Sequence, residues 1–226
     1  PIISIDEKDN GTMMDFGILK LLKDQVEINS EDKERAYLLI QGEIKLEWGN
    51  NEKIIRRESF LDENPWCLHL PAGEKVKITG LSDEAEISVS KTYNERIFKP
   101  KLYSPEECRT EEFGKGTAIE DTSKRVVKTI FDYSNADYAN LVVGEVINFP
   151  GKWSSYPPHY HPQPEIYFYK FYPEQGFGYS ECGEEVYKVR SNDTAIITNN
   201  ATHSQVAAPG YAMYYVWVIR NLENDP

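Results

Sequence analysis

The stretch WSSYPPHYHPQPEIYFYKFYPEQGF, residues Trp153–Phe177, decides both the expected fold and the expected chemistry of this 226-residue chain. It holds two of the four histidines, His159 and His161, and a carboxylate, Glu165, four positions after the second. Another histidine, His203, follows after several strand-like runs. His-x-His, then a carboxylate and a distant His, is the ligand spacing of a metal site inside a β-barrel. We therefore predict that these four side chains bind a metal ion.

The local backbone pattern supports this prediction. On an extended strand, residues two apart share a face, so His159 and His161 should point the same way from a strand over Trp153–His161. Glu165 should begin the next strand, at a spacing of roughly 4.8 Å. Three nitrogens and one oxygen leave coordination positions open on a divalent ion, which is typical of a catalytic site. A lone pair of histidines is more often structural, but the conjunction with Glu165 and His203 in a His-poor chain favours metal ligands.

Short β-runs separated by turn residues dominate the rest of the chain. In the first half, Ala36–Ile40 and Glu43–Trp48 predict two strands joined by a tight turn at Gln41-Gly42. The second half predicts strands over Val126–Tyr133, Leu141–Phe149, Trp153–His161, Glu165–Phe171, Gly176–Glu181, Glu184–Arg190, Thr194–Thr198, Ser204–Ala207 and Tyr211–Ile219. Many short strands at roughly 8–12-residue spacing are typical of a sandwich or barrel. The predicted fold class is therefore all-β, with two tandem jelly-roll barrels.

The domain boundaries follow from a change in composition. Residues 1–90 are expected to form the first barrel and residues 126–226 the second. Residues 91–125 are polar and charged, and we expect them to connect the two. Within them, Ser104-Pro105-Glu106-Glu107 predicts a short helix, because it offers an N-cap serine, a proline at the first position and a glutamate at the third. A plain turn is the alternative.

Composition excludes several classes of function. A net charge of -12, from 25 basic and 37 acidic residues, argues against binding to nucleic acid or to an anionic membrane surface. No apolar run approaches the roughly 20 residues that span a bilayer. The first residues lack the basic and apolar regions of a secretory signal. Three widely spaced cysteines do not suggest a disulfide framework, so we expect a cytoplasmic protein.

Six stretches carry a resemblance to a known family. Those in the second half are GEVINFPGKWSSYPPHYH (Gly144–His161), EIYFYKFYPEQGF (Glu165–Phe177) and HSQVAAPGYAMYY (His203–Tyr215). Those in the first half are RAYLLIQGEIKLEW (Arg35–Trp48), RRESF (Arg56–Phe60) and LHLPAG (Leu68–Gly73). Beyond the metal motif, which is similar to that of cupins, the chain resembles the 5-deoxyglucuronate isomerases of bacterial inositol catabolism. The resemblance covers most of the chain, and the related 5-keto-4-deoxyuronate isomerases match less well.

The resemblance implies a bicupin whose C-terminal barrel binds the metal and whose N-terminal barrel lacks ligands. It implies the conversion of 5-deoxy-glucuronate to 5-dehydro-2-deoxy-gluconate, an aldose–ketose isomerisation. The implied ligands are His159, His161, Glu165 and His203. The expected cofactor is one divalent transition metal, with zinc as the first choice and manganese, iron and nickel as alternatives. The remaining histidine, His69, has no such partner in sequence and is expected to be structural.

Tyrosines are the candidates for contacting a polyol substrate. Ten of the fifteen tyrosines fall between Tyr156 and Tyr215, and phenols combine an apolar ring with a hydrogen-bonding group. Strand alternation sends Tyr167, Tyr169 and Phe171 to the same side as Glu165. For each tyrosine, ordinary packing in a strand is the alternative. The predicted catalytic residues are Glu165, Tyr167, Tyr169 and Tyr215, and the predicted substrate-binding residues are Lys170, Gln175, Tyr179 and Tyr214.

A uronate substrate also requires a cation for its carboxylate. The candidates from Gly151 onward are Lys152, Lys170, Lys188, Arg190 and Arg220. Alternation places Lys170 on the face opposite Glu165, so an arginine of the first domain or of a neighbouring subunit, such as Arg57, is a further candidate.

The predicted partner is a small sugar acid, bound by a homo-oligomer that is a dimer or larger. Three alternatives stay open from the sequence. The same three-His, one-Glu site suits a cupin oxygenase, which would consume dioxygen. The substrate could be a different deoxy-uronate, or the chain could be a sugar-binding bicupin without catalysis.

Overall fold

The computed structural model describes residues 2–7, 11–116, 121–223 and 225, which fall into two compact units. The first unit takes its described residues from 1–7, 14–108 and 130–142, and the second from 8–13, 109–129 and 143–226. This division differs from the predicted boundaries at residues 90 and 125. The reason is that two segments form neighbouring strands of a sheet instead of a linker. One is Arg109–Phe113, inside the predicted connecting region, and the other is Arg125–Phe131, which starts at its last residue.

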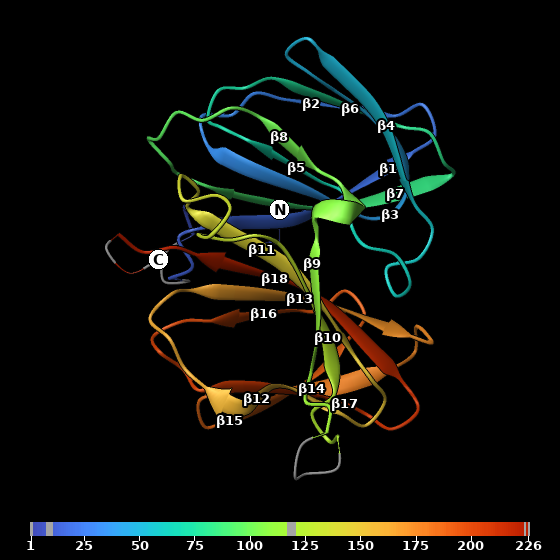
Figure 1. Ribbon diagram of the computed structural model, residues 1–226, viewed down its shortest axis with the longest axis vertical. Coiled ribbons are helices and arrows are strands. Elements are labelled where there is room, and N and C mark those ends of the chain that lie inside the picture. The colour runs from blue at the N-terminus through green and yellow to red at the C-terminus, as the bar shows by residue number, and fades with distance from the viewer. Residues whose placement is uncertain (1, 8–10, 117–120, 224, 226) are drawn as a thin grey trace. The chain divides into compact units, whose positions relative to one another are not determined.

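The first unit is built on one eight-stranded sheet (Figure 1). Its strands are β1 (Asp15–Leu22), β2 (Val26–Asn29), β3 (Glu34–Trp48), β4 (Asn51–Arg57), β5 (Cys67–Leu70), β6 (Val76–Gly80), β7 (Glu84–Thr92) and β8 (Lys101–Tyr103). One part of the sheet has the order β1-β7-β3-β5-β8. In the other part, β4 and β6 pair with β3, and β2 pairs with β6. A cluster of buried apolar side chains that includes Leu39, Leu46, Leu68 and Ile78 fills the core.

Strand β3 links the two parts of this sheet, and the tight turn predicted at Gln41-Gly42 is wrong. The strand runs unbroken over fifteen residues, with a register shift against β7 between Leu39 and Gln41. Gly42 has a φ of 99°, and a Cβ there would lie 2.6 Å from the Ala85 Cα. The glycine therefore marks a bend in one long strand, since only glycine combines that φ with so close an approach.

The single histidine of the first unit is a core residue. His69 is fully buried, its Nε2 lies 2.9 Å from Glu34 Oε1, and its ring stacks on Phe131 at 4.3 Å. The Glu34 carboxylate also accepts hydrogen bonds from the Asn94 side chain and the Asn140 backbone N–H. His69 therefore pairs with a buried, hydrogen-bonded carboxylate, as expected for a structural histidine.

The predicted short helix is confirmed as one 3-10 turn, Pro105–Glu107 (η1). Glu107 Oε2 accepts a hydrogen bond from the Ser104 backbone N–H at 3.0 Å, which is half of the expected capping box. None of the described residues forms a helix long and apolar enough to cross a membrane.

The second unit carries two sheets. Its strands are β9 (Arg109–Phe113), β10 (Arg125–Phe131), β11 (Leu141–Asn148), β12 (Trp153–His159), β13 (Glu165–Tyr172), β14 (Phe177–Cys182), β15 (Glu185–Arg190), β16 (Thr194–Ile197), β17 (His203–Ala207) and β18 (Ala212–Arg220). The end of β10 from Ile130 and the start of β11 up to Val142 are counted with the first unit. A six-stranded sheet has the order β16-β13-β18-β11-β10-β9, and a four-stranded sheet has the order β12-β17-β14-β15 (Figure 1). Buried side chains that include Tyr169, Phe171, Val189 and Met213 pack together in this unit. The nearly all-β architecture confirms the predicted fold class.

Candidate metal centre

The predicted ligands meet where the ends of three strands of the second unit converge. His159 is the last residue of β12, Glu165 is the first residue of β13, and His203 is the first residue of β17. His159 and His203 are register partners across the β12–β17 pair. His161 lies beyond β12, in the turn that leads to Glu165. The site is therefore assembled from both sheets of this unit.

Strand β12 is shorter than predicted. It ends at His159 instead of His161, and its pairing with β17 is irregular between Ser154 and His159. Pro157 and Pro158 explain the irregularity, because proline has no N–H to donate to a β-ladder. The two imidazoles still converge, with ring centroids 5.9 Å apart, but this convergence does not come from strict strand alternation.

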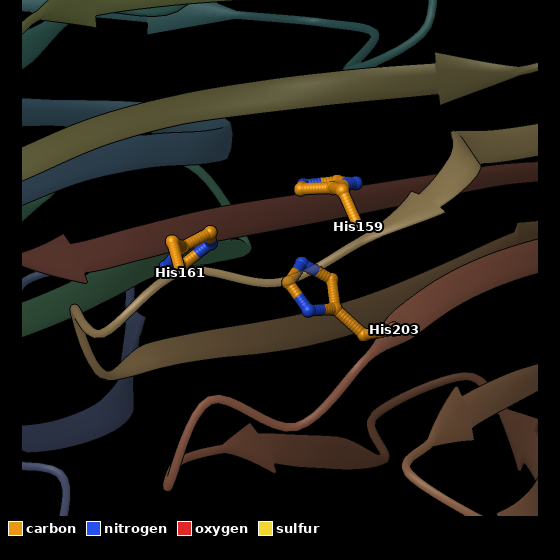
Figure 2. Close-up of side chains that lie close together, drawn as sticks. All are labelled: His159, His161 and His203. Atoms are coloured by element: carbon orange, nitrogen blue, oxygen red, sulfur yellow. The ribbon is translucent and has the colours of Figure 1, made fainter.

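Three imidazole rings face one another (Figure 2). One ligand atom from each of His159, His161 and His203 lies within 4.8 Å of the others, a spacing that could hold a metal ion. The His203 ring centroid lies 4.4 Å from that of His159 and 5.1 Å from that of His161. His203 is fully buried, whereas His159 is exposed, so the group opens toward solvent on one side.

The backbone fixes the tautomer of every ring. In each histidine Nδ1 lies within hydrogen-bond distance of a backbone carbonyl, which only accepts, so Nδ1 carries the proton and Nε2 keeps its lone pair. The three pairs are His159 with Ser155 (3.2 Å), His161 with Gln163 (2.9 Å) and His203 with Ala201 (3.0 Å). A donated second ring N–H is the usual way in which proteins orient metal-binding histidines.

Glu165 completes the group. Its carboxylate is buried, and Oε2 lies 3.2 Å from His161 Nε2 and 3.4 Å from His203 Nε2. With Nδ1 protonated, both nitrogens present lone pairs to an anionic oxygen, and a cation between them makes this arrangement favourable, either a metal ion or a proton on Nε2. The buried His203 Nε2 has no hydrogen-bond partner, which is the condition of a ligand atom. The donor set therefore fits a divalent transition metal ion.

The pKa values of Glu165 and of the histidines around it are shifted by their mutual contacts. Burial would raise the pKa of Glu165, but the neighbouring imidazoles of His161 and His203 lower it overall. The hydrogen bond to Glu165 raises the pKa of His161, while burial and the nearby His203 lower the pKa of His159. The carboxylate is thus held ionised next to imidazoles that differ in their affinity for a proton.

A cavity of about 290 Å³ opens beside the predicted metal ligands. Its lining comes from strands of both sheets and combines three of these residues with phenols, hydroxyls and one guanidinium. The lining residues are Arg125, Val127, Val146, Ser154, Ser155, His159, His161, Glu165, Tyr167, Tyr215, Trp217 and Ile219. The size and mixed lining suit a small polar molecule.

Two of the three predicted catalytic tyrosines line this cavity. Tyr215 Oη lies 2.5 Å from Ser154 Oγ, and Tyr167 Oη lies 3.5 Å from Ser155 Oγ. Burial raises the pKa of Tyr215 to about 12 and raises that of Tyr167 well above its ordinary value. Both phenols are therefore protonated at neutral pH and can donate hydrogen bonds to substrate oxygens, but they cannot act as bases there.

Tyr169 points into the core of the unit. Its hydroxyl is buried between Gln205 Oε1 at 2.6 Å and Ser180 Oγ at 3.2 Å, and it is not among the cavity-lining residues described above. A catalytic role for Tyr169 stays a prediction.

A pair of variants tests these different positions. Tyr169→Phe should lower the free energy of unfolding by about 1–3 kcal/mol, because Gln205 loses its buried donor. It should leave kcat of the expected aldose–ketose isomerisation within about threefold of wild type. Tyr167→Phe should lower that kcat by ~10²-fold, since it removes a phenol expected to donate to the substrate oxygens. Urea unfolding and steady-state kinetics on both variants separate the two effects. A large kcat loss in Tyr169→Phe with normal stability would instead place Tyr169 in the reaction.

The predicted substrate-binding residues lie elsewhere. Among the described residues, none of the four lines the cavity. The Lys170 Nζ lies 3.3 Å from Asn192 Oδ1, and the buried Tyr214 donates a hydrogen bond to the Glu145 carboxylate. Gln175 and Tyr179 are exposed. Their roles in binding stay predictions.

Arg57, named above as a possible carboxylate anchor, is fully buried in the first unit. Its guanidinium donates to the backbone carbonyls of Leu39, Phe60 and Glu63. The cavity-lining cation that the sequence reading missed is Arg125, which falls in the region expected to be a connection. The β-branched Val126-Val127 directly after it was the signal of a strand, and alternation then pairs Arg125 with Val127 on one face.

Comparison with known proteins gives one consistent result. The KduI/IolB family matches residues 1–225 of this chain. A 5-deoxy-glucuronate isomerase of Geobacillus kaustophilus is 28% identical over 239 residues, covering 93% of this chain and 83% of that protein. A 5-deoxy-glucuronate isomerase of Bacillus licheniformis is 29% identical over 198 residues, covering 77% and 70%.

Solved structures agree on the fold. An IolB-like protein from Salmonella typhimurium superposes with a TM-score of 0.86 at 24% identity, covering 93% of this chain and 84% of that one. Oxalate decarboxylase from Lactobacillus farciminis superposes with a TM-score of 0.70 at 11% identity, covering 92% and 77%. At these identities the likeness concerns the fold alone, which is of the cupin type.

Proposed function

Since this chain belongs to the KduI/IolB family, we propose that it is a metal-dependent aldose–ketose isomerase that converts 5-deoxy-glucuronate to 5-dehydro-2-deoxy-gluconate. One observation carries the proposal beyond family membership. Three imidazoles with fixed Nε2 lone pairs and one buried carboxylate converge beside a cavity lined with phenols. That combination supplies what the reaction requires, namely a Lewis-acid site and hydrogen-bond donors for a polyol.

We assign His159, His161, Glu165 and His203 as the metal ligands. Imidazole and carboxylate donors suit zinc first, with manganese, iron and nickel as alternatives. A bound divalent ion supplies Lewis-acid polarisation of the substrate carbonyl, which acidifies the neighbouring C–H. The remaining steps depend on the side chains of the cavity.

The reaction moves one hydrogen between neighbouring carbons. C1 gains the hydrogen that C2 loses, and the proton of the C2 hydroxyl passes to the C1 oxygen. The aldehyde thereby becomes a CH₂OH group and C2 becomes a ketone, so the atoms balance without any co-reactant. Negative charge develops on the C1 and C2 oxygens while the proton is in transit. In this proposal the protonated phenols of Tyr167 and Tyr215, which line the cavity, donate hydrogen bonds to that charge. Glu165 contributes to catalysis through its negative charge beside the imidazoles.

The deciding experiment is anaerobic incubation of metal-replete protein with 5-deoxy-glucuronate, followed by NMR. We expect loss of the aldose signals and growth of those of the ketose, with no dependence on dioxygen. An oxygenase would instead be inactive under these conditions and would consume oxygen in air. Absence of product from protein that holds one metal ion per chain contradicts the proposed reaction.

We also propose that the protein acts in a reducing cytoplasm. Among the described residues, Cys67, Cys108 and Cys182 form no disulfide bond, and cysteines outside disulfides are typical of that compartment. A homo-oligomer stays a prediction, which light scattering coupled to size-exclusion chromatography would test.

A further inference from the structure

Arg125, the first residue of β10, faces the same cavity as the metal ligands. Val127, two residues later, lines the cavity as well, which is the alternation expected of one strand face. Of the lining residues that the structure describes, Arg125 alone carries a permanently positive side chain. It is therefore the natural candidate for contacting an anionic group in the cavity.

The guanidinium is oriented by neutral groups and is not neutralised by them. Nη1 donates to the Ser123 carbonyl at 2.9 Å, Nη2 lies 3.4 Å from the Tyr156 carbonyl, and Cζ lies 5.5 Å from the centre of the Phe113 ring. Among the described residues, no carboxylate forms an ion pair with Arg125, although the protein carries a net charge of -12. Burial also lowers the pKa of this side chain, because its charge is partly removed from water.

A half-buried cation without a counter-ion is costly in the free protein, and an anionic ligand would remove that cost. The planar guanidinium matches a carboxylate in two parallel hydrogen bonds. In the proposed substrate the reacting carbons are C1 and C2 and the carboxylate is C6, so the two ends must be held by different groups. The cavity offers both, with the imidazoles for one end and Arg125 for the other.

We infer that Arg125 binds the substrate carboxylate and thereby makes the site selective for sugar acids over neutral sugars. The inference rests on the proposed function for the identity of the substrate. It assigns Arg125 to substrate binding and to the orientation of the sugar, since a carboxylate held at Arg125 directs the aldehyde end toward the imidazoles.

The test compares two sugars that differ only at C6, D-glucuronate and D-glucose, by calorimetry on metal-replete protein. Wild type should prefer glucuronate. Arg125→Gln should weaken glucuronate binding by about 10- to 100-fold, as expected for loss of a charge-assisted pair, and leave glucose binding unchanged. Lys124→Gln, which removes the same charge one residue earlier and outside the cavity lining, should leave both affinities unchanged.

Arg125→Lys is a second variant, needed where Arg125→Gln loses metal through a disturbed backbone at Tyr156. It keeps the positive charge but not the planar guanidinium. Glucuronate affinity should fall by about 3- to 10-fold, with metal content unchanged. Unchanged glucuronate affinity in a folded, metal-replete Arg125→Gln protein would overturn the inference even if the enzyme isomerises its substrate. A different outcome is also possible, in which glucuronate binding depends on Arg125 but the protein does not isomerise 5-deoxy-glucuronate. That outcome would refute the proposed reaction and support the anion site.

Discussion

Replacing His203 by alanine is expected to abolish stoichiometric metal binding and to lower kcat/KM by at least ~10³-fold, which corresponds to about 4 kcal/mol of transition-state stabilisation. His203 is the buried member of the three histidines, and its unpartnered Nε2 faces both Glu165 and the other rings. Without it, His159 and His161 are left as an exposed and a half-buried imidazole that lack a rigid third donor. Two histidines and one carboxylate hold a divalent ion less tightly.

His69 provides a matched control, because it is as fully buried as His203 and also pairs with a carboxylate. His69→Asn should lower the free energy of unfolding, since the buried Glu34 loses a partner, yet it should retain one metal ion per chain. Metal content measured by mass spectrometry, together with the rise in melting temperature on adding zinc, distinguishes the two variants. Stoichiometric zinc in His203→Ala would show that the metal is bound without His203.

The closeness of the predicted ligands could be predicted from sequence because it depends on few geometric choices. The spacing from His159 to Glu165 leaves room only for a strand end, a short turn and a new strand, and the structure has that order. The prediction that His159 and His161 share one face of a strand was less successful. Pro157 and Pro158 interrupt the β12 ladder, and His161 lies in the turn. The convergence of the rings depends on carbonyls of local turns, such as those of Gln163 and Ala201, which a periodicity argument does not include.

The cavity lining was harder to predict, because it depends on which strands become neighbours. Tyr167 and Tyr215 both line the cavity, although they are not register partners in the β13–β18 pair. Tyr169, which is the register partner of Tyr215, instead hydrogen-bonds inside the unit. Arg125 was missed because the polar composition of its surroundings suggested a linker. Strand neighbours also decided the outcome at β3. Gln41-Gly42 is typical of a turn in sequence, but Gly42 lies at a bend of one strand, where Ala85 of β7 passes close to it.

Glu165→Gln is expected to raise the metal dissociation constant by about 10- to 100-fold and to lower kcat/KM by ~10²-fold or more even at saturating metal. The substitution conserves shape and removes the negative charge that faces His161 and His203 at 3.2 and 3.4 Å. It also introduces an amide NH₂ group. If that group faces the imidazoles, it donates to the Nε2 lone pairs and competes with the metal for them.

Glu165→Asp distinguishes the effect of the negative charge from that of side-chain length. It keeps the carboxylate but shortens the side chain by one methylene. Metal affinity should therefore fall less than in Glu165→Gln, and turnover should fall below that of wild type. Isothermal titration with zinc and anaerobic kinetics on both variants measure the two quantities independently. Wild-type zinc affinity in Glu165→Gln would remove Glu165 from the ligand set and leave the three imidazoles as the whole protein contribution. Turnover would then decide whether the carboxylate acts on the substrate instead, since a group that touches only the substrate lowers kcat/KM without changing metal affinity.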